Sequence, residues 1–308
     1  MDPVSHTLTG AALGCTGLER RTRFGRLTLI AGANLPDIDA ATYLLDGVES
    51  LAFRRGITHG VAAVVVLPLL LAFAVKGLAV LTRRGRPDDA PLKQLLLLAA
   101  IAIATHPLLD LLNNYGIRLL MPVVERGWYG DTLYIIDPIV WTILLAGILS
   151  FAFLRAWPRR HLATNAFLGL FGVYIAASAL GTAAARGAAL AAAGPVPPQR
   201  LMASPVQLAP LSRDLVLEYP GEYRFGRVRL TPAPVVVLDE DAIAKGDPRD
   251  LALARGSPEG AAFLHWARFP YVRAADEGGH RVLRVADARY VREWDGGFGG
   301  IEIEIPAE

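Results

Sequence analysis

The chain has 308 residues, of which 53% are hydrophobic, and its mean hydropathy is +0.37. These values are high for a soluble globular protein and typical of a membrane protein with a soluble part. The net charge of +2 by itself favours no class of partner, and the single cysteine, Cys15, excludes an intramolecular disulfide framework.

The first residues, MDPVSH, contain no basic side chain. We therefore expect any insertion signal to be a retained helix and not a cleaved signal peptide. Six apolar segments follow, at about residues 4–18, 27–45, 61–81, 92–112, 135–154 and 162–193. A helix needs roughly 20 apolar residues to cross the bilayer core, so the last four segments are long enough, whereas the first is short and NLPDID interrupts the second. We expect an α-helical multi-span bundle over residues 1–194, with its first two segments short or broken.

Basic residues lie in alternate loops of this bundle. They are Arg20, Arg21, Arg23 and Arg26, then Arg83, Arg84 and Arg86, and finally Arg155, Arg159 and Arg160. The positive-inside rule places these loops in the cytoplasm, and it places the other loops and the tail outside. The sequence thus predicts a multi-pass protein of the cell (inner) membrane with an extracytoplasmic C-terminal domain. Arg54 and Arg55 fall in an outer loop and break the pattern, either as two tolerated charges or for a functional reason.

The tail begins at the proline-rich linker PVPPQR. Residues 195–308 contain 14 Lys or Arg and 17 Asp or Glu, a net charge of −3, against +5 for residues 1–194. DLVLEY, EYRFGRVRL, APVVVLD, HRVLRVADARYVREW and IEIEI alternate or are rich in β-branched residues, and Gly and Asp-Pro turns separate them. SPEGAAFLHWARF is compatible with one short helix. We expect a small β-rich domain at residues 195–308.

Polar residues in the apolar part are few and of selected types. They are His6, Asp37, Asp39, His59, His106, Asp110 and Asp137. All seven lie on the outer side of a topology that was derived from arginines alone. Ionisable groups near membrane depth are costly unless they are paired or bound to something. Each residue alone has a simpler explanation as a helix cap, a solvated group or a helix-stabilising pair, but the set favours a metal site.

Imidazole and carboxylate ligands suit Zn²⁺, and also Mn²⁺ or Fe²⁺. His106 and Asp110 are four residues apart, so they share one helix face. Pro36 in LPDIDA predicts a helix break that aims Asp37 and Asp39 into a cavity. Seven ligands exceed the number that one tetrahedral ion uses, so two or three ions are compatible with the set. A metal there would lower the pKa of water to about 7 and supply a nucleophile.

At these residues the chain resembles a known family. DPVSHTLTGAALG, NLPDID, RRGITHG, THPLLDLLNNYG and YIIDP, in this order, look like the YdjM-like family of membrane-bound predicted metal-dependent hydrolases, which is grouped with the zinc-dependent phospholipase C and P1-nuclease superfamily. The resemblance covers residues 1–154, and the tail resembles more weakly the added extracytoplasmic domain of some members. It implies that the seven His and Asp residues hold metal. Asn113 and Asn114 depart from the threonine that relatives often have before the Tyr-Gly.

The function that we expect from the sequence is hydrolysis of a phosphoester, such as a lipid head group or a related substrate, by metal-activated water at the outer membrane face. Asp37, Asp39 and His59 are the candidate catalytic residues. Arg54, Arg55, Asn114 and Tyr115 are the candidate substrate-binding residues, because guanidinium groups suit phosphate oxygens. A metal-ion or ion-coupled transporter and a non-enzymatic membrane anchor for the tail are the alternatives. The sequence contains no P-loop, dinucleotide fingerprint or basic-aromatic nucleic-acid surface, and it does not define an oligomeric state.

Overall fold

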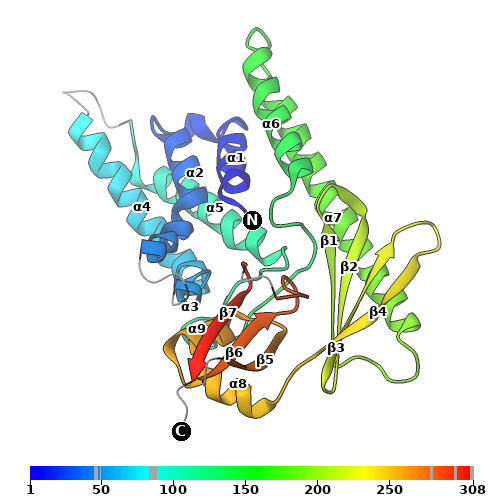
Figure 1. The fold of residues 1–308 in the computed structure, drawn as a ribbon. Helices are drawn as coiled ribbons and strands as arrows, with labels where there is room; N and C mark the ends of the chain where they lie inside the picture. The colour runs from blue at the N-terminus through cyan, green and yellow to red at the C-terminus, as the bar shows by residue number, and fades with distance from the viewer. Residues whose placement is uncertain (45–47, 49, 83–88, 278–279, 295–296, 306–308) are drawn as a thin grey trace. The chain divides into compact units, whose positions relative to one another are not determined.

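A computed structural model describes residues 1–44, 48, 50–82, 89–277, 280–294 and 297–305 (Figure 1). The chain forms two compact units. The first consists of Met1–Asp39, Arg55–Leu180 and Gln207–Pro210, and the second of Ala40–Arg54, Gly181–Val206 and Leu211–Glu308. The units therefore separate near residue 180 and not at the predicted boundary of 194/195. Arg83, Arg84 and Arg86, which we predicted to form one basic loop, lie outside the described residues.

The first unit is helical. Its elements are α1 (Pro3–Leu13), η1 (Leu18–Arg21), α2 (Gly25–Asn34), the start of the 3₁₀-helix η2 (Leu35–Leu44), η3 (Ile57–His59), α4 (Val61–Thr82), α5 (Leu92–Leu111), α6 (Pro138–Phe153) and most of α7 (His161–Ala192). The predicted break in the second segment is confirmed, because α2 ends at Asn34 and tight 3₁₀ turns carry Asp37 and Asp39.

Three helices among the described residues are long and apolar enough to cross a membrane, namely α4, α5 and α7. The described residues do not show six spans, and the first two apolar segments are short, as the sequence predicted. The segment at 135–154 yields only the 16 residues of α6, and α1 and α2 have 11 and 10 residues. At about 1.5 Å per residue, helices of this length do not reach across a hydrocarbon core of about 30 Å.

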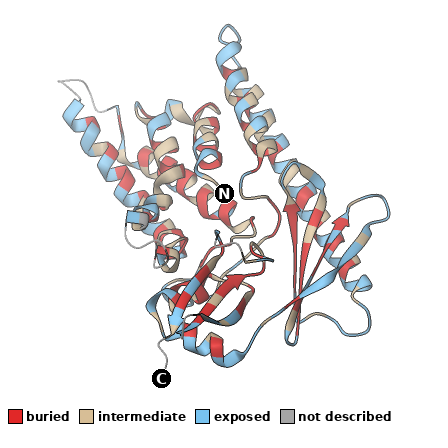
Figure 2. Cartoon of the chain, viewed as in Figure 1, coloured by how far each residue is buried: buried red, intermediate tan, exposed pale blue. Residues whose placement is uncertain are grey.

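The surface of α4 is mostly exposed (Figure 2). Its outward side chains include Val65, Leu70 and Phe73, each more than half exposed. A contiguous apolar surface of this kind is unfavourable in water, whereas lipid tails cover it at no cost. The helix therefore has the surface of a lipid-facing span.

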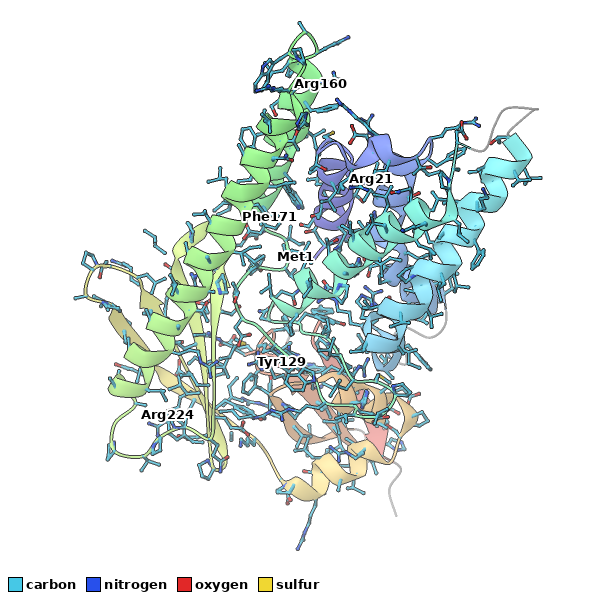
Figure 3. The ribbon with its side chains drawn as sticks, turned by 180° about the vertical axis from the view of Figure 1, so that it is seen from behind. Met1, Arg21, Tyr129, Arg160, Phe171 and Arg224 are labelled. Carbon is cyan, nitrogen blue, oxygen red and sulfur yellow. The ribbon has the colours of Figure 1, made fainter. Side chains whose placement is uncertain are left out.

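Two buried clusters hold the helices together. Leu71 and Val75 of α4 pack on Leu95, Ala99 and Ile103 of α5. A second cluster joins Met1, Leu109 of α5, Leu144 of α6 and Phe171 of α7 (Figure 3). Since α5 contributes to both clusters, it is the central helix of the unit, and its C-terminal end, with His106 and Asp110, is buried.

Basic residues of two predicted cytoplasmic loops meet at one end of the unit. The guanidinium carbons of Arg26 and Arg160 lie 5.8 Å and 4.1 Å from the ring centre of Phe151, near the C-terminal end of α6. The backbone N–H of Arg23 donates to the carbonyl of Asp89, just before α5 begins. His106 and Asp110 lie at the opposite end of α5, so the polar residues and the basic loops occupy opposite ends of the helices.

The second unit is built on two antiparallel-rich sheets. One has the order β1 (Arg200–Val206), β2 (Ala209–Tyr219), β3 (Glu222–Arg229) and β4 (Val235–Ala244), and the other β5 (Pro270–Glu277), β6 (His280–Asp287) and β7 (Gly300–Ile305). The helices α3 (Ser50–Phe53), α8 (Pro248–Arg255) and α9 (Pro258–Trp266) also belong to this unit, together with the ends of η2 and α7. Strands predicted at DLVLEY, EYRFGRVRL, APVVVLD and IEIEI and the short helix at SPEGAAFLHWARF are confirmed. The strand predicted over HRVLRVADARYVREW ends at Asp287, and β1, β5 and α8 were not predicted.

Side chains on both faces of the first sheet pack into hydrophobic clusters, whereas β4 is mostly exposed. Leu215 and Leu217 of β2 pack on Ala185 and Ala189 at the end of α7, and this packing explains why that part of the helix belongs to the second unit. On the other face, Val216 and Phe225 pack on residues of the second sheet, among them Tyr271. The β-rich domain thus has two hydrophobic clusters, one on each face of this sheet.

Candidate metal centre

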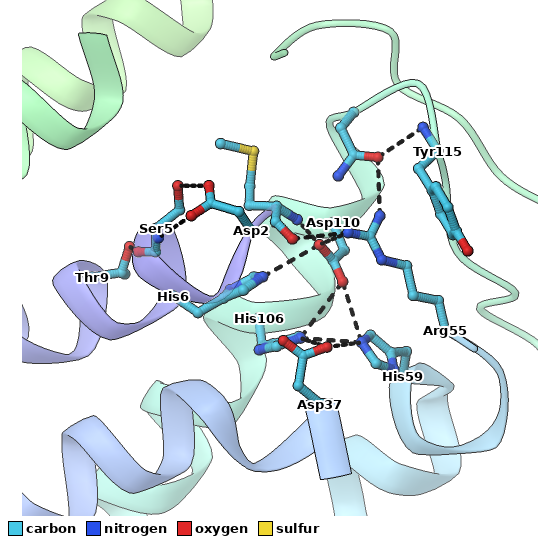
Figure 4. Close-up of polar contacts among 12 residues, drawn as sticks. Asp2, Ser5, His6, Thr9, Asp37, Arg55, His59, His106, Asp110 and Tyr115 are labelled. Atoms are coloured by element: carbon cyan, nitrogen blue, oxygen red, sulfur yellow. Dashed lines mark hydrogen bonds and ion pairs between the residues drawn. The ribbon is translucent and has the colours of Figure 1, made fainter. Parts of the chain in front are cut away.

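Five residues that lie far apart in the sequence converge in the first unit (Figure 4). They are His6 on α1, Asp37 on η2, His59 on η3, and His106 and Asp110 on α5. The three imidazoles and Asp110 have no exposed surface. These residues form two groups of three, His6–His106–Asp110 and Asp37–His59–His106. Within each group the potential ligand atoms all lie within 4.8 Å of one another.

One side of the cluster is made of atoms that carry lone pairs. His59 Nε2 and His106 Nε2 lie 3.1 Å apart, and Asp110 Oδ2 is 3.2 Å from the first and 3.5 Å from the second. Asp37 Oδ1 lies 3.8 Å from each of the two nitrogens. Each of the two carboxylate oxygens therefore lies within 3.8 Å of both imidazole nitrogens.

Hydrogen bonds on the far side of each ring fix which nitrogen carries the proton. His106 Nδ1 lies 2.6 Å from the carbonyl of Ala33, which can only accept, so Nδ1 is the donor. His59 Nδ1 lies 3.4 Å from Asp39 Oδ2 and 2.9 Å from the hydroxyl of Thr58, which itself donates to Asp39. Both rings thus turn an unprotonated Nε2 toward the cluster.

Burial keeps the His59 imidazole neutral. It lowers the pKa of His59, although the hydrogen bond and the charge of Asp39 oppose the shift. A neutral ring at pH 7 has its Nε2 lone pair available for a metal ion, as a ligand histidine requires.

The other side of the cluster contains His6 and the second oxygen of Asp110. The ring of His6 stacks on that of His106 at 3.6 Å, and its Nε2 lies 3.3 Å from Asp110 Oδ1. Among the described residues, neither ring nitrogen of His6 has an aligned hydrogen-bond partner. Buried polar atoms in this state are costly, and a cation bound to them would remove that cost. The donor set fits a divalent transition metal.

Arg55 lies inside the cluster. Its Nη2 is 3.1 Å from Asp110 Oδ1 and donates to the carbonyl of Met1, whose amino group also pairs with Asp110. Its guanidinium carbon lies 4.6 Å from the ring centre of Tyr115. Arg55 and Tyr115, two of the predicted substrate-binding residues, are therefore placed beside the candidate ligands.

Asp39 contacts His59 but belongs to neither group of ligand atoms. Its Oδ2 accepts from the backbone N–H of Arg55 and from Thr58, besides facing His59 Nδ1. Its geometry is that of a residue that positions a ligand, and not that of a ligand.

The structure does not bring Asp137 into the cluster. Its Oδ1 accepts the backbone N–H groups of Ile139 and Val140 at the start of α6, and its Oδ2 accepts the hydroxyl of Tyr174. Asp137 is a helix N-cap. Arg54 belongs to the second unit, apart from its neighbour Arg55, and Asn114 is part-buried just after α5.

Replacing Asp137 with alanine is therefore expected to leave the metal content of the purified protein unchanged. The substitution removes a helix cap and the Tyr174 hydrogen bond, which together stabilise α6 by about 1–2 kcal/mol. Metal analysis and thermal unfolding of the same sample in detergent check both parts. A loss of metal in this variant would return Asp137 to the ligand set.

Two residues of the site were not assigned a role from the sequence. Asn113 Oδ1 accepts from the backbone N–H groups of Tyr115 and Gly116 and from Arg55 Nη1, so it shapes the exit of α5 around Arg55. Thr58 bridges Asp39 and His59. Their positions in the sequence could have indicated these roles, because each is a hydrogen-bonding residue adjacent to a candidate ligand or within one helical turn of it.

Comparisons with known proteins agree with the helical part of the chain. The family described as YdjM inner membrane protein matches residues 1–193. A curated relative, "Uncharacterized protein YfhP" of Bacillus subtilis (strain 168), is 24% identical over 160 residues, which are 48% of this chain and 45% of the relative. The chain thus spans about half the length of that relative. No solved structure matches.

Proposed function

The chain belongs to the YdjM inner membrane protein family, and we propose that it is a membrane-bound, metal-dependent hydrolase of phosphoesters. The resident cofactor is a divalent transition metal, with zinc as the first choice and manganese or iron as alternatives. His6, Asp37, His59, His106 and Asp110 would hold it.

One observation carries the proposal. The unprotonated Nε2 atoms of His59 and His106 face each other at 3.1 Å, with Asp110 Oδ2 within 3.5 Å of both. Lone pairs this close repel one another unless a proton or a cation lies between them. Burial disfavours the protonated imidazole of His59, so a cation is the better partner.

A divalent ion in this set would act as a Lewis acid and make water a stronger nucleophile near neutral pH. The chain's own residues have distinct tasks around it. His59 is held in one orientation by Asp39, which acts as a positioning residue. Asp37 is the most accessible of the ligands, with 16% of its side chain exposed, so its carboxylate is the group that can take up a proton from incoming water.

Arg55 gives the site its affinity for an anionic substrate. The guanidinium is buried and fixed on the ring of Tyr115, next to the ligand atoms. A cation in a site of low dielectric attracts phosphate oxygens more strongly than one at the surface does.

Exposed apolar residues near the site favour a lipid substrate at the membrane–water interface. The backbone N–H of Val61, where α4 begins, donates to the carbonyl of Leu119. Leu120, Val123 and Val124 follow directly and are exposed, so they extend the apolar surface of α4 next to His59. The positive-inside rule puts this end of the helices outside, opposite the arginines around Phe151.

The purified full-length protein in detergent provides the test. We expect at least one equivalent of tightly bound transition metal and hydrolysis of a chromogenic aryl phosphoester or of phosphatidylglycerol in vesicles, lost on chelation and restored by Zn²⁺ or Mn²⁺. Less than one equivalent of metal, with all five ligands intact, would contradict the proposal. Metal uptake into vesicles without hydrolysis would favour the transporter instead.

A further inference from the structure

The two candidate ligand groups share His106. Its Nδ1 is occupied by the carbonyl of Ala33 at 2.6 Å, so only Nε2 is available as a ligand. An unprotonated imidazole nitrogen has a single lone pair in the ring plane, and it binds one ion at a time. The two groups are therefore alternative descriptions of one position and cannot both be filled by separate ions with three ligands each.

The charge of the surrounding groups also favours a single metal ion. Asp37, Asp39 and Asp110 contribute formal charges of −3, and Arg55 and the amino group of Met1 contribute +2. One divalent ion changes this sum of −1 to +1, whereas a second would leave +3 among groups that are almost entirely buried. An uncompensated buried charge is strongly unfavourable.

Arg55 is built into the site and is not a mobile surface residue. Its Nη1 donates to Asn113 and to the carbonyl of Gly116, and its Nη2 to the carbonyl of Met1. Its backbone adopts φ 50°, which non-glycine residues rarely do, and is held by Asp39 at its N–H and by the backbone N–H of Arg118 at its carbonyl. The chain thus accepts an unfavourable backbone conformation while it holds a guanidinium against Asp110 Oδ1.

We infer that the centre holds one divalent ion, and that Arg55 supplies at Asp110 Oδ1 the positive charge that a second ion would otherwise bring. The inference rests on the proposed metal site and narrows it, because the seven candidate ligands alone were compatible with two or three ions. It also gives Arg55 a task in the unliganded protein, where Arg55 and the amino group of Met1 together balance the charge of Asp110.

The wild-type protein tests the number of ions without any substitution. Full-length protein in detergent is stripped with a chelator, titrated with Mn²⁺ and examined by electron paramagnetic resonance. We expect one tight equivalent with the signal of an isolated ion. Two tight equivalents, or the signal of a spin-coupled pair, would overturn the one-ion inference and leave the proposed function standing. No tight Mn²⁺ or Zn²⁺ would overturn both.

Two variants test the role of Arg55. Arg55→Gln removes the charge next to Asp110, so we expect Mn²⁺ to bind at least about tenfold more tightly or a second, weaker equivalent to appear. Arg55→Lys keeps the charge and is expected to stay within about threefold of wild type. Arg126→Gln, which removes an exposed arginine of the α5–α6 loop, is the matched control. Unchanged or weaker binding and no second equivalent in a folded Arg55→Gln protein would overturn the role of Arg55.

Discussion

Asp110→Asn should remove the tightly bound metal and reduce phosphoester hydrolysis by on the order of a thousandfold or more. Asp110 contacts all three histidines of the cluster and Arg55. Its Oδ2 faces His59 and His106, and its Oδ1 faces His6 and Arg55. Asparagine keeps the size of the side chain and removes its charge, so the ion loses an anionic ligand and Arg55 loses its counter-charge. Metal content and hydrolysis are measured on the same purified sample.

The matched control is Asp137→Asn. It makes the same chemical change at the same end of the helices, and asparagine serves as an N-cap about as well as aspartate. We expect this control to retain wild-type metal and activity. An Asp110→Asn protein that inserts normally and keeps its full metal content would show that the ion lies elsewhere.

The sequence was sufficient to predict most of the cluster because spacing determines which residues share a face. His106 and Asp110 are four positions apart, which is about one helical turn, so both side chains project from the buried face of α5. Pro36 ended a regular helix before Asp37, and η2 indeed follows α2. Residue type then identified the candidate ligands, since His and Asp are rare inside an apolar helical unit unless they have a function.

Asp137 shows where residue type alone misleads. An aspartate followed by a proline is a common helix start, because the carboxylate caps the first N–H groups and proline suits the first turn. Asp2–Pro3 and Asp247–Pro248 begin α1 and α8 in the same way, and Ser257–Pro258 begins α9. The dipeptide at Asp137 therefore carried a local signal that competed with the metal interpretation.

Neighbouring arginines could not be separated from the sequence. Arg54 and Arg55 lie in an irregular segment, where successive side chains follow no fixed period. The positive φ of Arg55 sets the direction of its side chain, and it depends on Asp39 and Arg118, which are distant in sequence. The length of helix in the apolar segment at 135–154 was overestimated for a related reason, because hydropathy marks an apolar segment but not the length of regular helix within it.

Asp287→Asn is expected to destabilise the β-rich unit by about 3–5 kcal/mol, since it leaves a buried cation without its partner. Asp287 is fully buried at the end of β6. It pairs with the buried guanidinium of Arg289 at 2.8 Å and accepts the backbone N–H groups of Arg268, Phe269 and Arg289. Hydrogen-exchange mass spectrometry of the full-length protein in detergent would report the change as roughly 10²–10⁴-fold faster exchange in residues 268–291. The exposed Asp241→Asn serves as control and should stay near wild type.

The carboxylate of Asp287 also makes the stability of the β-rich unit fall at low pH. Burial alone would raise the pKa of Asp287, but the charge and hydrogen bonds of Arg289, with the backbone donors, outweigh it and hold the pKa below its usual range. A lowered pKa in the folded state means that the stabilisation is complete above the unfolded value of about 3.9 and is lost as the pH falls through the folded value. We therefore expect the hydrogen-exchange protection of residues 268–291 in the wild type to fall as the pH drops below about 4. In Asp287→Asn, we expect this protection to be low already at neutral pH and to change less as the pH falls. An identical loss of protection at low pH in both proteins would show that other carboxylates cause the pH dependence.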